Sequence, residues 1–267
     1  MSRPLRVAIN GASGRMGQAL QALVRADRRF ELVHAVVSPG SQNDGMPIYR
    51  ELSDALRYAH DWSTARDMDV VIDFSGPAGL SATLDYCIAH RVALVTGTTG
   101  LDAALTQRLD SAAAHIPLLR AANFSLGVAV LTRLLREASA ALRDWDLEII
   151  EAHHGRKEDA PSGTALALGE AAAEARGTTL AQDAVYTREG RPGPRQAGTI
   201  GFAVVRGGDI VGEHQALLIG PGERVELAHR ATDRLIFARG AVEAAHWLAG
   251  KSAGHYDLDA MLAERTG

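Results

Sequence analysis

Short apolar runs alternate with helix-forming segments along the first half of the chain, and this alternation strongly limits its possible folds. Strands that alternate with helices form parallel sheets whose two faces are both covered. The runs that predict strands cover residues 6–10, 32–37, 69–74, 92–95 and 116–119. Residues 1–125 therefore predict an α/β domain built on a doubly wound parallel sheet.

A glycine-rich turn follows the first expected strand and opens a helix that should end near residue 26. The turn consists of Gly11, Ala12, Ser13, Gly14, Arg15, Met16 and Gly17. Backbone N–H groups at a helix start bind phosphate, and glycine lets the phosphate come close. Because the glycine spacing differs from the usual G-x-G-x-x-G, a purely structural turn is the alternative interpretation. The place of the turn after the first strand favours a Rossmann-like dinucleotide-binding domain.

Later turns of the same sheet can complete a cofactor site, because ligands of doubly wound sheets bind at the carboxyl ends of the strands. The turns contain Gly76 after the third expected strand, Gly97, Thr98 and Thr99 after the fourth, and Ala121, Ala122, Asn123 and Phe124 after the fifth. The alternative is that these turns only connect elements.

The end of the second expected strand normally decides which cofactor binds. An acidic residue there binds the ribose 2′-hydroxyl of NADH, and a nearby arginine accommodates the 2′-phosphate of NADPH. This chain has Val37 and Ser38 in that place, which offer neither. NADH and NADPH are thus both compatible with the sequence.

The first domain should end at residue 125, and the pattern is different in the second half of the chain. A helix is expected at 127–142. Three strand-forming runs then follow one another between residues 199 and 229 without helices between them. Glycine-rich turns at 207–208 and 220–222 join these runs in the manner of hairpins. This predicts an α+β second domain with an antiparallel or mixed sheet.

The polar stretch at residues 177–193 is rich in glycine and proline, and it is expected to be a mobile loop or lid. In and beside it, Arg188, Arg191 and Arg195 are expected to be solvated, and contact with a substrate is the alternative. A final amphipathic helix is expected at 237–248.

Residues 148–164, with the sequence EIIEAHHGRKEDAPSGT, hold the densest group of chemically active side chains. The beginning of this stretch predicts a strand, in which alternation places Glu151 and His153 on one face and His154 on the other. Gly155 and the polar residues after it should end the strand. Histidine can change charge near neutral pH, and Lys157 can present a proton or a positive charge. These side chains are candidates for proton transfer.

A helix start follows directly, because the helix-forming run ALALGEAAAEA comes after Ser162, Gly163 and Thr164. Backbone N–H groups at a helix start carry partial positive charge and bind carboxylates or phosphates. We therefore expect an oxyanion or carboxylate site beside a proton source. In the alternative interpretation, Ser162 only caps the helix, the histidines are structural and Lys157 is solvated.

Composition excludes several classes of partner. The 267 residues have a net charge of -4 without a basic run, so nucleic acid is not an expected partner. No stretch approaches the roughly 20 apolar residues that span a bilayer, and the N-terminal residues lack a signal-peptide pattern. We therefore expect a cytoplasmic protein without a membrane contact. The single cysteine, Cys87, is expected to be a buried free thiol.

A metal site is not expected. Glu151, His153 and His154 are possible ligands, but the two histidines are adjacent at a strand end. Zinc hydrolases place two histidines one helical turn apart, as in H-E-x-x-H.

The block from Glu151 to Ala165 resembles the 4-hydroxy-tetrahydrodipicolinate reductase family of the diaminopimelate route to lysine. That family carries Glu-(Leu or Ala)-His-His-x-x-Lys-x-Asp-Ala-Pro-Ser-Gly-Thr-Ala, and this chain matches the motif. The similarity extends to residues 11–17, 97–100, 121–125 and 208–214. The exception is Val37 and Ser38, where the family often has an acidic residue followed by arginine.

The resemblance implies that hydride from NADH or NADPH reduces the dehydrated ring of 4-hydroxy-tetrahydrodipicolinate to tetrahydrodipicolinate. It further implies that residues 1–125, joined again by 235–267, form the dinucleotide-binding domain. The cofactor would bind through 11–16, 97–99 and 121–124. Residues 126–234 would form the substrate-binding and oligomerisation domain of a homotetramer.

The same resemblance assigns roles in the central stretch. Lys157 would act as the acid that neutralises the charge left by hydride transfer, with His153 as its partner. His154 and the helix start at Ser162, Gly163 and Thr164 would hold a carboxylate of the dicarboxylate substrate. Because cofactor and substrate would bind to different domains, closure over the bound pair is expected.

Two other functions are compatible with parts of the sequence. A related NAD(P)-dependent amino-acid or semialdehyde dehydrogenase would explain the cofactor domain, but it would not need the block around residues 151–165. A non-catalytic dinucleotide sensor could keep the glycine turn, but it should have lost Lys157 and His153.

Overall fold

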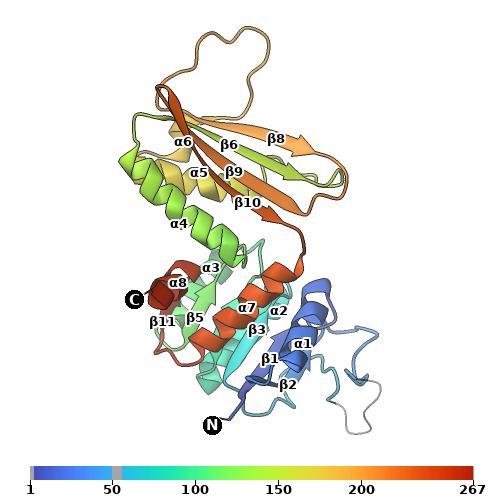
Figure 1. Ribbon diagram of the computed structural model, residues 1–267. Coiled ribbons are helices and arrows are strands. Elements are labelled where there is room, and N and C mark those ends of the chain that lie inside the picture. Colours follow the sequence, from blue (N-terminus) through green and yellow to red (C-terminus); the bar gives the residue numbers. More distant parts are fainter. Residues whose placement is uncertain (1–2, 50–55, 267) are drawn as a thin grey trace. The chain divides into compact units, whose positions relative to one another are not determined.

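The chain forms two compact units in the computed structural model, which describes residues 3–49 and 56–266 (Figure 1). The first unit comprises Met1–Ser125 and Leu235–Gly267, and the second comprises Leu126–Arg234. Each unit has its own sheet and its own hydrophobic core. Across the described ranges, no helix is both long and apolar enough to cross a membrane.

The first unit is built on a six-stranded parallel sheet with the order β11-β5-β4-β3-β1-β2. Its strands are β1 (Leu5–Asn10), β2 (Phe30–Val36), β3 (Val70–Asp73), β4 (Ala93–Thr96), β5 (Pro117–Arg120) and β11 (Gly254–Tyr256). The predicted doubly wound sheet is therefore confirmed. The strand β11 was not predicted, because three residues are too few to show a periodic pattern. It joins the sheet beside β5 and brings the C-terminal segment back to the first unit.

Helices cover both faces of this sheet. They are α1 (Arg15–Ala26), α2 (Pro77–His90), α3 (Ala103–Ala112), α7 (Leu235–Leu248) and α8 (Leu258–Thr266). The helices α1 and α7 lie side by side over one face (Figure 1), and α2 and α3 pack together over the other. Leu84, Leu94 and Leu109 belong to the core under α2 and α3. Cys87 lies in the same core as a buried free thiol, as predicted.

The second unit contains a five-stranded mixed sheet with the order β10-β9-β6-β8-β7. Its strands are β6 (Asp146–His153), β7 (Ala184–Val185), β8 (Ile200–Arg206), β9 (Gly212–Gly220) and β10 (Glu223–Ala231), and its helices are α4 (Leu126–Ala141), α5 (Gly163–Arg176) and α6 (Leu180–Asp183). The strand β6 pairs parallel with β8 and antiparallel with β9. The predicted α+β architecture with a mixed sheet is confirmed.

The turn at residues 207–208 is not a hairpin, contrary to the sequence prediction. The strand β6 lies between β8 and β9, so the two strands that this turn connects do not pair with each other. By contrast, β9 and β10 form a hairpin in which Gly220 pairs with Glu223. A glycine-rich turn therefore identifies a change of direction without identifying the partner of the next strand.

The prediction of a mobile loop at 177–193 was partly wrong. This stretch contains α6 and the edge strand β7, which pairs with β8. Two of the expected solvated arginines also have specific partners. Arg188 makes two hydrogen bonds of 2.8 Å to the carboxylate of Glu148. Arg195 donates to the carbonyl oxygens of Leu147 and Thr199.

The two faces of the second sheet differ in their surroundings. The helices α4 and α5 pack against one face, where Ile149, Phe202 and Leu218 are buried. On the other face, here called the open face, Val205 and Ile219 are exposed to solvent. Because neighbouring residues of a strand point to opposite faces, the buried positions of β6 include Leu147, Ile149 and Glu151. A carboxylate is thus placed among core side chains.

Candidate functional site

The first unit contains a cavity of about 620 Å³ at the carboxyl ends of β1, β2 and β3. Its lining includes Asn10, Gly11, Ser13, Gly14, Val36, Val37, Ser38, Pro39, His60, Asp61, Trp62, Phe74, Ser75, Gly76, Pro77, Ala78, Gly79 and Ala82. Open α/β sheets bind ligands in this crevice, where the strand order reverses. This cavity is therefore the candidate dinucleotide site.

The glycine turn packs closely against the turn after β3 and leads directly into α1. Gly11 has a positive φ of 76°, and a side chain there would meet the carbonyl oxygen of Phe74 at 2.5 Å. Gly14 is the N-cap residue of α1, and no side chain among the described residues caps this helix start. A helix start without a side-chain cap has backbone N–H groups available for an anion.

The other predicted cofactor residues differ in their distance from this cavity. Ala12 is fully buried beneath the turn. Arg15 and Met16 begin α1 without lining the cavity. The turns at 97–99 and 121–124 follow β4 and β5 at the same edge of the sheet, and they do not line it either. Both adjoin its wall, because the ring of Phe74 lies against Gly97 and 5.3 Å from the ring of Phe124.

A fully buried carboxylate, Asp73, joins the loops of this cleft at the end of β3. It accepts hydrogen bonds from Asn10 Nδ2 at 2.7 Å, Ser75 Oγ at 2.9 Å and Thr98 Oγ1 at 2.5 Å. Asn10 in turn accepts from the backbone N–H of Gly11 at 2.9 Å. Burial raises the pKa of Asp73, and these donors oppose the shift. One side chain thereby fixes the glycine turn, the turn after β3 and the turn after β4.

In the second unit, the carboxylate of Glu151 holds the predicted site together. Only 1% of this side chain is exposed. Arg206 donates to both carboxylate oxygens at 2.7 Å, His153 contacts one through Nδ1 at 2.6 Å, and the backbone N–H of Ser162 donates to the other at 3.0 Å. Burial favours a raised pKa, but these hydrogen bonds outweigh it and lower the pKa of Glu151. Glu151 is thus ionised at neutral pH, and His153 Nδ1 must be the donor.

The two histidines have different surroundings, as the alternation of β6 predicts. His153 is the last residue of β6 and shares its face with Glu151. His154 lies beyond the strand, where its backbone N–H donates to the carbonyl of Ile210 at 2.8 Å. The buried Nδ1 of His154 has no hydrogen-bond partner among the described residues. Burial, followed by nearby positive charges such as Arg234, lowers the pKa of His154.

Lys157 lies in the loop between β6 and α5 and is held by a neighbouring carboxylate. Its Nζ donates to the two carboxylate oxygens of Asp159 at 2.8 and 2.9 Å. Its backbone N–H donates to the carbonyl of His154 at 3.1 Å. The same loop is anchored by Arg206, which donates to the carbonyl of Asp159 at 2.7 Å. The lysine is thus paired and lies close to His154 in the chain.

Ser162 caps α5, as the alternative interpretation proposed for its hydroxyl. Its Oγ accepts from the backbone N–H of Ala165 at 3.2 Å and lies 3.1 Å from His214 Nε2. The side chain is buried. Gly163 is exposed and Thr164 is half-buried. Of the three predicted residues, only the last two present surface to a ligand from the surrounding solvent.

His214 and Arg206 also belong to this site, although neither was among the predicted site residues. His214 faces Glu151 across the β6–β9 pairing, and its ring meets that of His153 edge-on at 5.2 Å. Burial lowers the pKa of His214 to about 4, and the charge of His153 adds to this effect. His214 is therefore neutral at physiological pH. Strand pairing brings these residues together from distant parts of the chain, so the motif at residues 151–165 alone could not place them beside Glu151.

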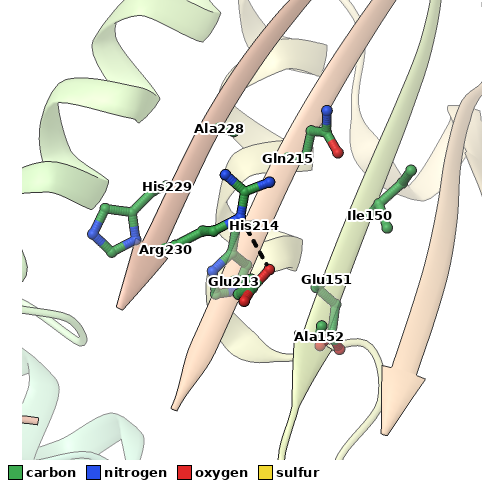
Figure 2. A pocket seen from close by; sticks show the side chains of 9 residues that line it. All are labelled: Ile150, Glu151, Ala152, Glu213, His214, Gln215, Ala228, His229 and Arg230. Carbon is green, nitrogen blue, oxygen red and sulfur yellow. Dashed lines mark hydrogen bonds and ion pairs between the residues drawn. The ribbon is translucent and has the colours of Figure 1, made fainter. Parts of the chain in front are cut away.

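A smaller cavity of about 50 Å³ lies beside Glu151 and His214, between β6, β9 and β10. Figure 2 shows its lining, with Arg230 and Glu213 joined by an ion pair of 3.3 Å. The cavity could hold a few water molecules, but it is too small for a ring with two carboxylates. In the part of the chain that the structure describes, no group of three or more His, Cys, Asp or Glu side chains could hold a metal ion.

The fold and the glycine turn in its cleft define a protein of the Rossmann-like dinucleotide-binding class. Comparison with known families is more specific. The model described as "Dihydrodipicolinate reductase, N-terminus" matches residues 5–124, and "Dihydrodipicolinate reductase, C-terminus" matches residues 127–262. The chain belongs to the dihydrodipicolinate reductase family, and the resemblance seen in its sequence is confirmed.

Individual relatives agree with this assignment. The 4-hydroxy-tetrahydrodipicolinate reductase of Acinetobacter baumannii is 45% identical over 98% of this chain and 97% of its own length. The enzyme of the same name from Cereibacter sphaeroides is 48% identical over 96% and 97%. A dipicolinate-bound dihydrodipicolinate reductase from Paenisporosarcina sp. TG-14 has the same fold, with a TM-score of 0.76, 24% identity and coverage of 95% and 97%.

The neutral state of buried His214 predicts a specific pH dependence of stability. Its pKa is about 4 in the folded chain and about 6.5 in an unfolded one. Between these values the unfolded state binds a proton that the folded state does not, so stability falls as pH falls. Between pH 7 and pH 5, the free energy of unfolding should therefore fall by about 2 kcal/mol less in His214→Gln than in the wild type.

Urea denaturation at pH 5, 6, 7 and 8 measures the effect. His255→Gln is the matched control for the loss of a histidine, because His255 is exposed. Parallel curves for the wild type and His214→Gln would contradict a neutral buried His214.

Proposed function

We propose that the chain reduces the dehydrated form of 4-hydroxy-tetrahydrodipicolinate to tetrahydrodipicolinate with NADH or NADPH, a step of the diaminopimelate route to lysine. The observation that carries the proposal is that buried Glu151 accepts hydrogen bonds both from His153 and from the backbone N–H of Ser162 at the start of α5. This arrangement lies in a family whose relatives with 45–48% identity bear the name of this reductase. The full-length matches favour it over a related dehydrogenase or a sensor.

Lys157 is the proposed acid, with His153 as its partner. Hydride arriving at a conjugated carbon leaves negative charge, which a positioned proton donor must neutralise. The pairing of Lys157 with exposed Asp159 keeps the ammonium group beside the end of β6. Release of this exposed pair costs little, since such ion pairs contribute about 0–1 kcal/mol. Glu151 orients the ring of His153 and leaves Nε2 for another partner.

A carboxylate of the substrate is proposed to bind at His154 and the start of α5. The first backbone N–H groups of a helix have no partner inside it and attract anions. Gly163 and Thr164 are the first two residues of α5, and Ser162 supports this helix start by capping it. The relative from Paenisporosarcina sp. TG-14 is bound to dipicolinate, a dicarboxylate of the class expected here.

The first unit is proposed to hold the nicotinamide cofactor. The pyrophosphate would lie on the glycine turn at residues 11–16, and the turns at 97–99 and 121–124 would contact the remainder. When bound, the cofactor supplies the hydride. The second unit would then bind the substrate.

The open face of the second sheet is the proposed surface for association into a homotetramer. Val205 and Ile219 are apolar side chains exposed on this face, and the burial of apolar surface drives most association between protein chains. The cytoplasm is the proposed location of the assembly.

The decrease in absorbance of NADH or NADPH with the freshly made condensation product of pyruvate and aspartate semialdehyde tests the activity. Oxidation of the nucleotide should require both the protein and this substrate. If neither nucleotide is oxidised although both bind, the proposed reaction is wrong.

Lys157→Ala tests the assignment of the acid. The kcat should fall by about 10²–10⁴-fold, the usual contribution of a positioned acid, while KM changes little. Lys251→Ala is a matched control, because Lys251 pairs with Glu264 on the surface of the first unit. Unchanged turnover in Lys157→Ala would show that another group donates the proton.

A further inference from the structure

The cofactor cleft receives a wall that the sequence pattern did not predict. At the end of β2, Val37 and Ser38 line the cavity without the usual acidic residue or arginine. The cavity is also lined by His60, Asp61 and Trp62, which lie more than twenty residues later in the chain. These three residues therefore lie beside the end of β2, which has no side chain of its own that would recognise the adenosine half of the cofactor.

Backbone hydrogen bonds fix this segment beside the end of β2. Ala59 forms a parallel bridge with Val36. The N–H of Val37 donates to the carbonyl of Ala59 at 2.9 Å, and the N–H of Ala59 donates to the carbonyl of Ala35 at 3.0 Å. The residues that follow Ala59 are thus carried alongside the residues that follow Val36. Residues 60–62 therefore reach the cleft beside the end of β2, as the end of a neighbouring strand would.

The side chain of Asp61 is held in one orientation and stays charged. Its Oδ1 accepts from the backbone N–H of Ser63 at 3.0 Å and from the hydroxyl of Ser63 at 2.7 Å. These bonds, the hydroxyl first, lower the pKa of Asp61. A second carboxylate stands close by, since Asp44 contacts His60 Nδ1 at 2.7 Å. This end of the cleft therefore carries two carboxylates with the ring of His60 between them, 3.6 Å from Asp61 through Nε2.

The same wall also carries aromatic and small apolar side chains. The ring of Trp62 stacks on Tyr86, with 4.7 Å between the ring centres. Ala78 and Ala82 of α2 line the cavity as well. Among the described lining residues there is no lysine and no arginine. A flat aromatic surface suits adenine, and the described lining residues include no lysine or arginine that could pair with a 2′-phosphate.

We propose that residues 60–62 recognise the adenosine half of the cofactor and that Asp61 accepts a hydrogen bond from the ribose 2′-hydroxyl, so that the chain prefers NADH to NADPH. The proposal rests on the cofactor site of the proposed function. A 2′-phosphate in this position would meet the carboxylate of Asp61, whereas Asp44 does not line the cavity and pairs with His60. Two like charges a few ångströms apart in a partly screened cleft repel each other enough to change affinity about tenfold.

Equilibrium binding of NADH and of NADPH, followed by nucleotide fluorescence at 0.1 M salt, tests the preference without any substrate. The wild type should bind NADH about tenfold more tightly. Asp61→Asn should bring the two affinities to within about twofold, because it weakens the binding of NADH and strengthens the binding of NADPH. Asp44→Asn should reduce the ratio less, because it removes only repulsion. Asp67→Asn is the matched control, because Asp67 is exposed in the same loop and does not line the cleft.

Equal affinities in the wild type, or a ratio that Asp61→Asn leaves unchanged in a variant with wild-type circular dichroism, would overturn the proposal. This failure is distinct from failure of the proposed reaction. A protein that binds NADH preferentially without oxidising it with the substrate would support the preference and contradict the reaction.

Discussion

The buried contact between Glu151 and Arg206 is the interaction on which the second unit's site depends. The guanidinium group of Arg206 pairs with both oxygens of Glu151 and also holds the loop carbonyl of Asp159. The same carboxylate also accepts hydrogen bonds from His153 and from the backbone N–H of Ser162. Two strands, a loop and a helix start are thereby fixed to one charge. Loss of one partner from such a buried pair typically costs about 3–5 kcal/mol.

Each unit is organised by a buried carboxylate, and the pKa values of the two carboxylates are shifted in opposite directions. In each, a buried carboxylate near the carboxyl end of a strand fixes the turns that form the site: Asp73 in the first unit and Glu151 in the second. Glu151 has an arginine beside it, and its pKa is lowered. Asp73 has only hydroxyl and amide donors, and burial raises its pKa. The cofactor cleft is therefore held by neutral donors, whereas the candidate substrate site is held by a compensated charge.

The sequence predicted local features well and pairing between distant segments poorly. Apolar periodicity located the strands and helices of the first sheet, and the alternation in β6 correctly placed Glu151 and His153 on the same face. Strand order depends on contacts between distant residues, so the position of β6 between β8 and β9 could not be predicted from glycine turns. For the same reason His214 and Asp61, which reach their sites through pairing with β6 and β2, were not among the predicted site residues.

The most direct test of this account is calorimetric binding of dipicolinate to the NADH-bound protein, in the wild type and in Glu151→Gln. Glu151 is buried and turned toward Arg206, so its effect on a ligand must pass through the groups it positions. The account predicts that the variant, with circular dichroism like that of the wild type, binds dipicolinate at least about tenfold more weakly, since it loses charge-assisted hydrogen bonds to the strand end and the helix start. Equal affinity in a folded Glu151→Gln protein would contradict it.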